Sequence, residues 1–430
     1  MDVKILPGTL SGTLEAIPSK SELHRMLICA AFADNPTGIL FAPSAYTDEA
    51  ALPNDIRATI SCLRALGAAF IVSPGRIAVT PADPHKKADS PLLDCGESGS
   101  TLRFLLPVAA AVSEEPSFTG GGRLPERPIG ELANALKNHG IRFSADKLPF
   151  TCSGVLSGGV FEIPGDISSQ YLTGLLLALP LLPESGTIRL TTALRSSAYI
   201  DITEQVMSDF GIRIERSGNE FRTTGANRCH TPGTIRAGGD WSNMAAFLAA
   251  SAMRKGNRIQ CLGLRNDSCQ GDKHVLDLLR GFGAGVHLTE DTITTEWQPL
   301  SGTSIDIDET PDLLPVLAAA GCAAEGETLF FNAGRLRLKE SDRIESTARM
   351  IRSLGGTVRT TADSLVIEGN GSLKGGEVDA ENDHRIVMAA AAASVICEEP
   401  VIIHGAEAVN KSYPGFWNDF RSLKGVCHVL

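Results

Sequence analysis

Residues 381–395 read ENDHRIVMAAAAASV, a short polar segment followed by an almost unbroken run of small apolar residues. A helix that is apolar on nearly every face must be enclosed, so this run predicts a buried helix. The same arrangement recurs five more times along the chain. The other segments are SKSELHRMLICAAFA (19–33), CGESGSTLRFLLPVAAAV (95–112), PGDISSQYLTGLLLALP (164–180), GGDWSNMAAFLAASAM (238–253) and DETPDLLPVLAAAG (308–321).

The spacing of these segments indicates an internal repeat. Their anchor residues lie 70 to 77 positions apart: Ser21, Ser98, Ser168, Asp240, Asp312 and Asp383. A second marker keeps the same phase, because amphipathic helices such as 55–66 and 343–354 end at a Gly suited to the left-handed C′ position. These glycines are Gly67, Gly140, Gly211, Gly283, Gly355 and Gly425. Two markers with one period predict six β-α-β-α-β-β units in the 430 residues, three per domain.

Composition excludes several classes of protein. With 43% hydrophobic and 21% charged residues the chain is an ordinary globular protein, and its net charge of -11 argues against a basic surface for nucleic acid or an anionic membrane. The 10 cysteines show no zinc spacing and read as small buried side chains in a reducing compartment. The start, MDVKILPGTLSG, resembles no targeting peptide, and no apolar stretch is long enough to span a membrane. We expect a cytoplasmic protein.

Cations at helix starts indicate an anion site. The positive end of a helix dipole disfavours Lys and Arg, yet Lys20 and Arg25 bracket the first predicted helix start. Arg103 lies within the second predicted helix, and Arg385 follows Asp383 and His384 in the sixth. Each anchor Ser or Asp can be a simple N-cap, but the neighbouring cations are explained if anions bind there. Further cations lie in GGGRLPERPIG (120–130), RLRLKESDRIE (335–345) and NKSYPGF (410–416), although a charge run such as 335–345 can also be internally paired.

These segments together resemble the 5-enolpyruvylshikimate-3-phosphate synthases, a family of enolpyruvyl transferases. The pieces stand in family order: PSKSELHR (18–25), CGESGSTLR (95–103), ERPIG (126–130), PGDISSQY (164–171), SSAYIDIT (196–203), DETPD (308–312), LKESDRI (338–344), NDHRIVMA (382–389) and NKSYP (410–414). The resemblance implies an inside-out α/β barrel in each of two similar domains. It assigns 19–229 to the upper domain and 1–18 with 230–430 to the second, with the active site in the cleft between them. The polar stretch 228–232 is the natural break.

The resemblance also implies the reaction. The carboxyvinyl group of phosphoenolpyruvate passes to the 5-hydroxyl of shikimate 3-phosphate and phosphate is released, in the pathway to chorismate and the aromatic amino acids. No metal or organic cofactor is implied, and the chain is expected to be a monomer. Shikimate 3-phosphate is expected to meet Lys20, Ser21, Arg25, Ser168, Ser169, Gln170, Ser196, Tyr199, Asp312 and Lys339. Phosphoenolpyruvate is expected to meet Lys20, Gly99, Arg127, Gln170, Arg343, Arg385 and Lys411.

Two carboxylates carry the expected proton transfers. Asp312 is the expected base for the attacking hydroxyl, and Glu340 the expected proton carrier for the methylene carbon. Lys20 is expected to assist. The chain departs from the family at Glu97 and Arg335, two positions where an Asn is common. Gly99 predicts an enzyme that glyphosate inhibits.

Two alternatives remain on sequence grounds. A UDP-N-acetylglucosamine enolpyruvyl transferase shares the fold, but its mobile loop carries a Cys and residues 120–127 contain none. A ring-shaped clamp of six α/β units needs a basic inner surface, which an acidic chain does not favour. His384 is expected to support its neighbours, and Arg103 to pair with a residue such as Glu97.

Overall fold

The computed structural model describes residues 1–430 except 84–85, 183, 224–228 and 290–291. It divides into two compact units: unit 1 is Met1–Ile17 with Gly238–Leu430, and unit 2 is Pro18–Ala237. The break expected from the sequence begins at Arg228, which lies outside the described residues. The chain that follows stays in unit 2 as far as Ala237.

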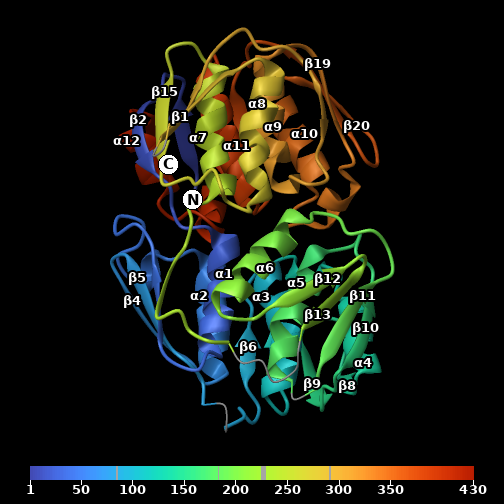
Figure 1. The fold of residues 1–430 in the computed structure, drawn as a ribbon. Coiled ribbons are helices and arrows are strands. Elements are labelled where there is room, and N and C mark those ends of the chain that lie inside the picture. Colours follow the sequence, from blue (N-terminus) through green and yellow to red (C-terminus); the bar gives the residue numbers. More distant parts are fainter. Residues whose placement is uncertain (84–85, 183, 224–228, 290–291) are drawn as a thin grey trace. The chain divides into compact units, whose positions relative to one another are not determined.

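Each unit holds three helices that are buried along most of their length, in the segments that the sequence predicts. In unit 2 these are α1 (Lys20–Ala31), α3 (Gly99–Val112) and α5 (Ser169–Ala178), and in unit 1 α7 (Trp241–Met253), α9 (Leu314–Ala323) and α11 (His384–Ala393). All residues of α9 are buried. Because most side chains on α7, α9 and α11 are small, the three helices pack directly on one another inside unit 1 (Figure 1). The predicted α/β fold with enclosed helices is confirmed.

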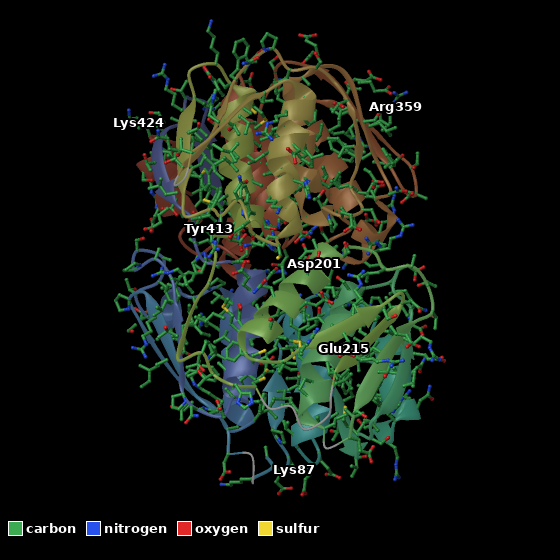
Figure 2. The ribbon with its side chains drawn as sticks, viewed as in Figure 1. Lys87, Asp201, Glu215, Arg359, Tyr413 and Lys424 are labelled. Atoms are coloured by element: carbon green, nitrogen blue, oxygen red, sulfur yellow. The ribbon has the colours of Figure 1, made fainter. Side chains whose placement is uncertain are left out.

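A second set of helices is amphipathic and covers the outside of each unit. They are α2 (Asn54–Ala65), α4 (Gly130–Asn138), α6 (Ala198–Asp209), α8 (Val275–Phe282), α10 (Arg343–Ser353) and α12 (Phe416–Ser422). Five of the six predicted glycines after these helices have positive φ, from 75° to 104°. The sixth prediction is wrong: Lys424 (Figure 2) takes the left-handed conformation, with φ 69°, in place of Gly425. Gly425 instead lies against the ring of Phe420, where a Cβ would clash.

Six four-stranded mixed sheets surround the buried helices. Unit 2 has β6-β7-β9-β8, β10-β11-β13-β12 and β14-β3-β5-β4, and unit 1 has β18-β19-β21-β20, β16-β17-β15-β2 and β22-β23-β1-β24. The unit 2 strands are β3 (Thr37–Leu40), β4 (Ala69–Ser73), β5 (Arg76–Thr80), β6 (Leu92–Asp94), β7 (Ser117–Thr119), β8 (Ile141–Phe143), β9 (Phe150–Gly154), β10 (Gly159–Ile163), β11 (Gly186–Leu190), β12 (Ile214–Ser217), β13 (Glu220–Thr223) and β14 (Thr234–Arg236). The unit 1 strands are β1 (Val3–Leu6), β2 (Ser11–Glu15), β15 (Arg258–Leu262), β16 (Gly285–Leu288), β17 (Thr292–Glu296), β18 (Ser304–Asp306), β19 (Glu325–Phe331), β20 (Thr357–Thr360), β21 (Leu365–Asn370), β22 (Gly376–Asp379), β23 (Val401–His404) and β24 (Val426–Val429).

Three strands pair far from their own repeat. β14 precedes α7 in sequence yet pairs in parallel with β3, and β2 precedes α1 yet pairs in parallel with β15. The first and fourth repeats have therefore exchanged their first strands. β1 lies between β23 and β24 and completes the sheet of the sixth repeat. The first 17 residues consequently belong to unit 1.

Candidate active site

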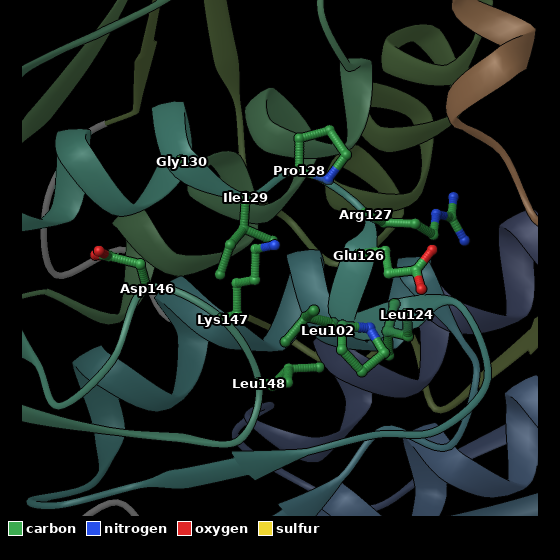
Figure 3. A pocket seen from close by; sticks show the side chains of 11 residues that line it. Leu102, Leu124, Glu126, Arg127, Pro128, Ile129, Gly130, Asp146, Lys147 and Leu148 are labelled. Atoms are coloured by element: carbon green, nitrogen blue, oxygen red, sulfur yellow. The ribbon is translucent and has the colours of Figure 1, made fainter.

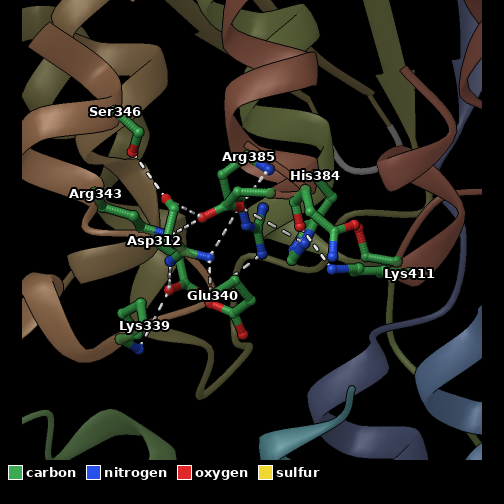
Figure 4. Close-up of polar contacts among 12 residues, drawn as sticks. Asp312, Lys339, Glu340, Arg343, Ser346, His384, Arg385 and Lys411 are labelled. Atoms are coloured by element: carbon green, nitrogen blue, oxygen red, sulfur yellow. Dashed lines mark hydrogen bonds and ion pairs between the residues drawn. The ribbon is translucent and has the colours of Figure 1, made fainter. Parts of the chain in front are cut away.

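The carboxylate of Asp312 is surrounded by three cations in unit 1 (Figure 4). It lies in the short 3-10 helix η5 (Pro311–Leu313), just before α9. Oδ1 accepts from Arg343 Nη1 at 2.6 Å and from Lys339 Nζ at 3.4 Å, while Oδ2 lies 3.4 Å from Arg385 Nη2. Burial acts to raise the pKa of Asp312, but the three cations outweigh it and hold the pKa well below its usual range. The group is therefore a carboxylate and, with these cations in place, a weak base.

Arg343 is held rigidly by three carboxylates. Its side chain is 1% exposed, and it donates to Asp383, to Asp312 and to Glu340, with the bond to Glu340 Oε2 at 2.8 Å. Burial alone would lower the pKa of this guanidinium, but Asp383, Glu340 and Asp312 raise it well above its usual value. Asp383 also caps α11 by accepting from the backbone N–H of Arg385 at 2.9 Å. The start of α11 and the start of α10 are thus joined through one buried ion pair.

Arg385 has spare hydrogen-bonding capacity. Its residue is 6% exposed, Nη1 donates to the carbonyl of Ser242 at 2.8 Å, and within the described residues Nε has no partner. A buried N–H without an acceptor is costly, so this guanidinium suits an arriving anion. Lys411, also buried, donates to the carbonyl of Asn382 at 2.6 Å and lies in the same region (Figure 4).

Asp272 is a buried carboxyl beside this cluster that sequence reasoning missed. It lies in the 3-10 helix η4 (Gly271–His274), is 5% exposed and accepts a short hydrogen bond from Ser242 Oγ. Burial, and next the charge of Asp312, raise the pKa of Asp272 to about 7. The only sequence signal was an Asp in a polar turn, which is ordinarily exposed.

In unit 2, Lys20 begins α1 and forms an ion pair with Asp55 on α2, with Nζ and Oδ2 2.7 Å apart. The two side chains are only 16% and 12% exposed. Asp55 was not predicted as part of the site, because an acidic residue in the first turn of a helix is common for its effect on the helix dipole.

Gly99 lies directly under two guanidinium groups. A Cβ built at this position would lie 2.6 Å from Arg127 Nη1 and 2.9 Å from Arg103 Nη1. Arg103 donates to Gln170 Oε1 at 2.7 Å and to the carbonyl of Pro128 at 2.9 Å, while Gln170 Nε2 donates to Ser100 Oγ at 3.0 Å. The predicted residues Gly99, Arg127 and Gln170 therefore lie together, with Arg103 orienting Gln170.

Five of the residues predicted for shikimate 3-phosphate lie at the starts of two helices of unit 2, α5 and α6. Ser168 caps α5 by accepting from the N–H of Gln170 at 3.3 Å, and Ser169 is the first helical residue. Ser196 has a left-handed φ of 53° and precedes Tyr199 on α6. Ser168 and Ser169 therefore stand at the N-terminus of α5, where a phosphate is favoured.

Arg25 is buried between three helices of unit 2. It is 2% exposed and makes four hydrogen bonds, to Ser21 O, Thr173 Oγ1, Tyr199 O and Thr203 Oγ1. Burial lowers the pKa of Arg25 to about 10. The guanidinium joins α1, α5 and α6, and through the carbonyls of Ser21 and Tyr199 it positions two residues predicted to meet substrate.

Most of the anchor residues cap helices, and some also belong to the predicted site. Ser98, Ser168, Asp240 and Asp383 accept from backbone N–H groups at helix starts, as simple N-caps do. Ser19, not Ser21, caps α1. Two anchors also bind cations: Asp383 receives Arg343, and Asp312 receives Lys339, Arg343 and Arg385.

A cavity of about 180 Å³ lies behind the loop that carries Arg127 (Figure 3). Leu102, Leu124, Ile129 and Leu148 contribute its apolar lining, and the Arg127 side chain points away from Asp146 and Lys147. Glu126, Arg127, Asp146 and Lys147 add charged groups to the lining, so the cavity borders the Arg127 side of the predicted site. Among the described residues, no His, Cys, Asp and Glu side chains are grouped to hold a metal ion, and no helix has the length and apolar character to cross a membrane.

The chain is similar to known proteins over its whole length. The family model for EPSP synthase (3-phosphoshikimate 1-carboxyvinyltransferase) matches residues 6–420. A 3-phosphoshikimate 1-carboxyvinyltransferase of Clostridium kluyveri is 41% identical over 98% of this chain and 97% of its own length, and that of Clostridium novyi is 38% identical over 99% and 98%. Among solved structures, EPSP synthase of Acinetobacter baumannii has a TM-score of 0.80 at 24% identity, covering 99% of both chains. The enolpyruvyl transferase NikO of Streptomyces tendae has a TM-score of 0.77 at 17% identity, covering 99% and 98%. These two structures establish the fold.

Proposed function

The chain belongs to the EPSP synthase family, the 3-phosphoshikimate 1-carboxyvinyltransferases, and on that premise we propose which of its residues carry the reaction. The enzyme transfers the carboxyvinyl group of phosphoenolpyruvate to shikimate 3-phosphate in the shikimate pathway. The set of residues around Asp312 in unit 1 and the set around Lys20 and Arg127 in unit 2 serve the same two substrates. We also propose that the protein is cytoplasmic and a monomer. Light scattering tests the monomer, for which we expect a mass near 45.5 kDa.

Phosphoenolpyruvate is bound by cations from both sets, and Arg385 supplies the observation that carries this assignment. Its buried Nε has no acceptor among the described residues, and its contact to Asp312 is long at 3.4 Å. A carboxylate or phosphate oxygen satisfies that donor and gains a charge-assisted bond. Lys20, Gly99, Arg127, Gln170, Arg343 and Lys411 complete the set.

Shikimate 3-phosphate is bound mainly through polar groups at helix starts. Its phosphate meets Ser168, Ser169 and Gln170 at the N-terminus of α5, where the serine hydroxyls and the helix dipole favour an anion. Its ring hydroxyls meet Asp312 and Lys339. Lys20, Ser21, Arg25, Ser196 and Tyr199 form the remainder, with Arg25 acting through the backbone of Ser21 and Tyr199.

The mechanism is an addition followed by an elimination. Glu340 must carry a proton before addition begins. The 5-hydroxyl oxygen then bonds to C2 of phosphoenolpyruvate while Asp312 takes the hydroxyl proton and Glu340 gives its proton to the methylene carbon, forming a tetrahedral ketal phosphate. The C–O bond to phosphate then breaks, the departing phosphate takes up the proton held on Asp312, and Glu340 takes back a methyl proton as the double bond forms again. Lys20 stabilises the developing charge on the phosphate.

Substrate binding makes Asp312 a better base. In the unliganded protein Lys339 and Arg385 help to keep the pKa of Asp312 low. When the two anionic substrates engage these cations, their effect on Asp312 weakens and its pKa rises toward the range in which a carboxylate accepts a proton. The base is thus activated only in the presence of both substrates.

Two isosteric variants test the assignment. We expect Asp312→Asn and Glu340→Gln each to lower kcat by roughly 10² to 10⁴-fold, measured as phosphate release that requires both substrates. Asp306→Asn, which alters an exposed carboxylate at the end of β18, is the control and should keep full activity. Near-normal turnover in Asp312→Asn would remove it from the mechanism, and phosphate release with UDP-N-acetylglucosamine as acceptor would support the alternative transferase.

A further inference from the structure

Four buried polar side chains form a continuous hydrogen-bonded chain inside unit 2. His24 on α1 bonds through Nδ1 to Thr59 Oγ1 on α2 at 2.8 Å, and Thr59 bonds to Thr101 Oγ1 on α3 at 2.7 Å. Thr101 Oγ1 donates to Ser98 Oγ at 2.8 Å. We call His24, Thr59, Thr101 and Ser98 the hydroxyl chain. Its members are between 0% and 1% exposed, so solvent does not compete for these bonds.

The hydroxyl chain has a preferred direction. Nε2 of His24 is buried without a hydrogen-bond partner in the described part of the protein. An unpaired acceptor is less costly than an unpaired N–H, so the proton resides on Nδ1 and is donated to Thr59. Burial, and next Lys20 and Arg25, lower the pKa of His24 well below its usual value, which keeps the ring neutral. The Thr59 hydroxyl then donates to Thr101, and the Thr101 hydroxyl donates to Ser98.

Both branches of this chain end next to residues proposed to bind substrate. Ser98 is the N-cap of α3 and directly precedes Gly99, which lies under Arg127. Thr101 Oγ1 also lies 3.3 Å from the carbonyl of Asp55, the residue that holds Lys20. Thr101 is therefore the point where the turn at Gly99 and the Lys20–Asp55 pair meet.

We propose that Thr101, supported by Thr59 and His24, is a positioning residue that holds the Ser98–Gly99 turn and the Lys20–Asp55 pair in the geometry that binds phosphoenolpyruvate. This role rests on the proposed assignment of Lys20, Gly99 and Arg127 to that substrate. Thr101 makes no contact with the reacting atoms. Its effect is on the placement of groups that do, where a small displacement costs affinity.

The test is a pair of substitutions at one position. Thr101→Val keeps the side-chain shape and the backbone N–H that donates to the N-cap Ser98, but it removes the hydroxyl. Thr101→Ser keeps the hydroxyl. For Thr101→Val we expect the KM for phosphoenolpyruvate to rise about five- to tenfold, with the KM for shikimate 3-phosphate within about twofold of the parent value. Thr101→Ser should restore the parent KM.

Control variants separate positioning from general stability. Thr328 on β19 is also fully buried, but its hydroxyl has no partner among the described residues, so Thr328→Val should leave both KM values unchanged. If Thr101→Val does not fold, Thr59→Val is measured against Thr59→Ser, with a smaller rise in the same KM expected. A folded Thr101→Val or Thr59→Val enzyme with a lower Tm and unchanged KM for phosphoenolpyruvate overturns the proposal.

The same measurements on Lys20→Met and Asp312→Asn distinguish this inference from the proposed function. If these variants lose activity while the threonine variants keep the parent KM, the positioning role fails and the site assignment stands. If Lys20→Met and Asp312→Asn keep full activity, the site assignment itself fails, and the positioning role that rests on it fails too.

Discussion

Individual residues of this enzyme are constrained by what lies within a few ångströms. Gly99 has no side chain because Arg127 and Arg103 occupy the space where a Cβ would be. Asp312 remains ionised because three cations outweigh the effect of its burial, whereas Asp272, nearby, has one hydroxyl donor and a raised pKa. Two carboxyls of the same unit thus have opposite protonation behaviour for identifiable local reasons.

The first prediction concerns Gly99→Ala. Its Cβ would lie 2.6 Å from Arg127 Nη1, so the guanidinium must move. We expect the KM for phosphoenolpyruvate to rise roughly tenfold and inhibition by glyphosate to weaken, while the unaltered enzyme is sensitive. Gly121→Ala is the matched control, because no atom lies within 4 Å of a Cβ at that position of the neighbouring loop. Equal inhibition of Gly99→Ala and the parent enzyme would contradict the prediction.

The second prediction concerns Asp272→Asn. Because the pKa of Asp272 is raised from 3.8 to about 7 on folding, the folded state binds more protons than the unfolded state between these values. Asp272 therefore lowers stability increasingly as the pH rises from about 4 to 7. The Asn variant should be more stable than the parent by up to about 4 kcal/mol at pH 8, and by only about 1 kcal/mol near pH 4.5.

Thermal unfolding at the two pH values measures this difference. Asp277→Asn, whose side chain is 64% exposed on α8, is the control and should change the stability at pH 8 by about 1 kcal/mol or less. A stability difference for Asp272→Asn that is the same at both pH values would show that the carboxyl is not protonated on folding.

At the scale of elements, the helix starts of unit 1 are connected through charge. Asp383 caps α11 and also binds Arg343 at the start of α10, so one carboxylate fixes two helices. Both side chains are at most 1% exposed. Removing one partner from such a pair leaves the other charge buried and uncompensated.

The third prediction follows from that pair. Asp383→Ala should lower the free energy of unfolding by about 3 to 5 kcal/mol and reduce activity, because Arg343 loses its anchor and α11 loses its cap. The comparison is Glu381→Ala, which breaks the ion pair with Arg349 on the same helix α10. The Arg349 side chain is 56% exposed, and we expect a loss of about 1 kcal/mol or less. Denaturant unfolding measures both, and similar losses in the two variants would contradict the argument.

At the scale of the whole molecule, the exchanged strands decide which residues fold together. Unit 2 is a continuous segment, Pro18–Ala237, with all three of its sheets complete. Unit 1 needs β1 and β2 from the start of the chain and the remainder from after residue 237.

The fourth prediction compares fragments of the chain. A fragment of residues 18–237 should fold alone with cooperative thermal unfolding, because its core and sheets contain no strand from elsewhere. A fragment of 18–229 lacks β14, exposes the edge of β3 and should be less stable. A fragment of 238–430 lacks β1 and β2 and should not fold cooperatively. Equal stability of 18–229 and 18–237 would show that β14 is dispensable.

Local sequence was sufficient to predict the repeat, the enclosed helices and the cations near helix starts. Such features depend on periodicity and on the residue types within one helix, as at 381–395, and therefore survive without knowledge of distant neighbours. The sequence predicted Gly425 as the left-handed residue after α12, but Lys424 takes that conformation. The packing of Gly425 against Phe420, rather than the conformational freedom of Gly, decides that turn.

Only the tertiary structure decided which residues and strands pair across long distances in the sequence. Asp55 meets Lys20 across 35 positions, Asp383 meets Arg343 across 40, and β2 meets β15 across almost 250. No local pattern specifies such pairs, because they arise when separate repeats bury their apolar faces together and bring polar groups into the same low-dielectric space. By itself the sequence determined that this protein is a six-unit enolpyruvyl transferase, whereas the burial of its charges and the cations packed beside them set opposite pKa shifts for Asp312 and Asp272.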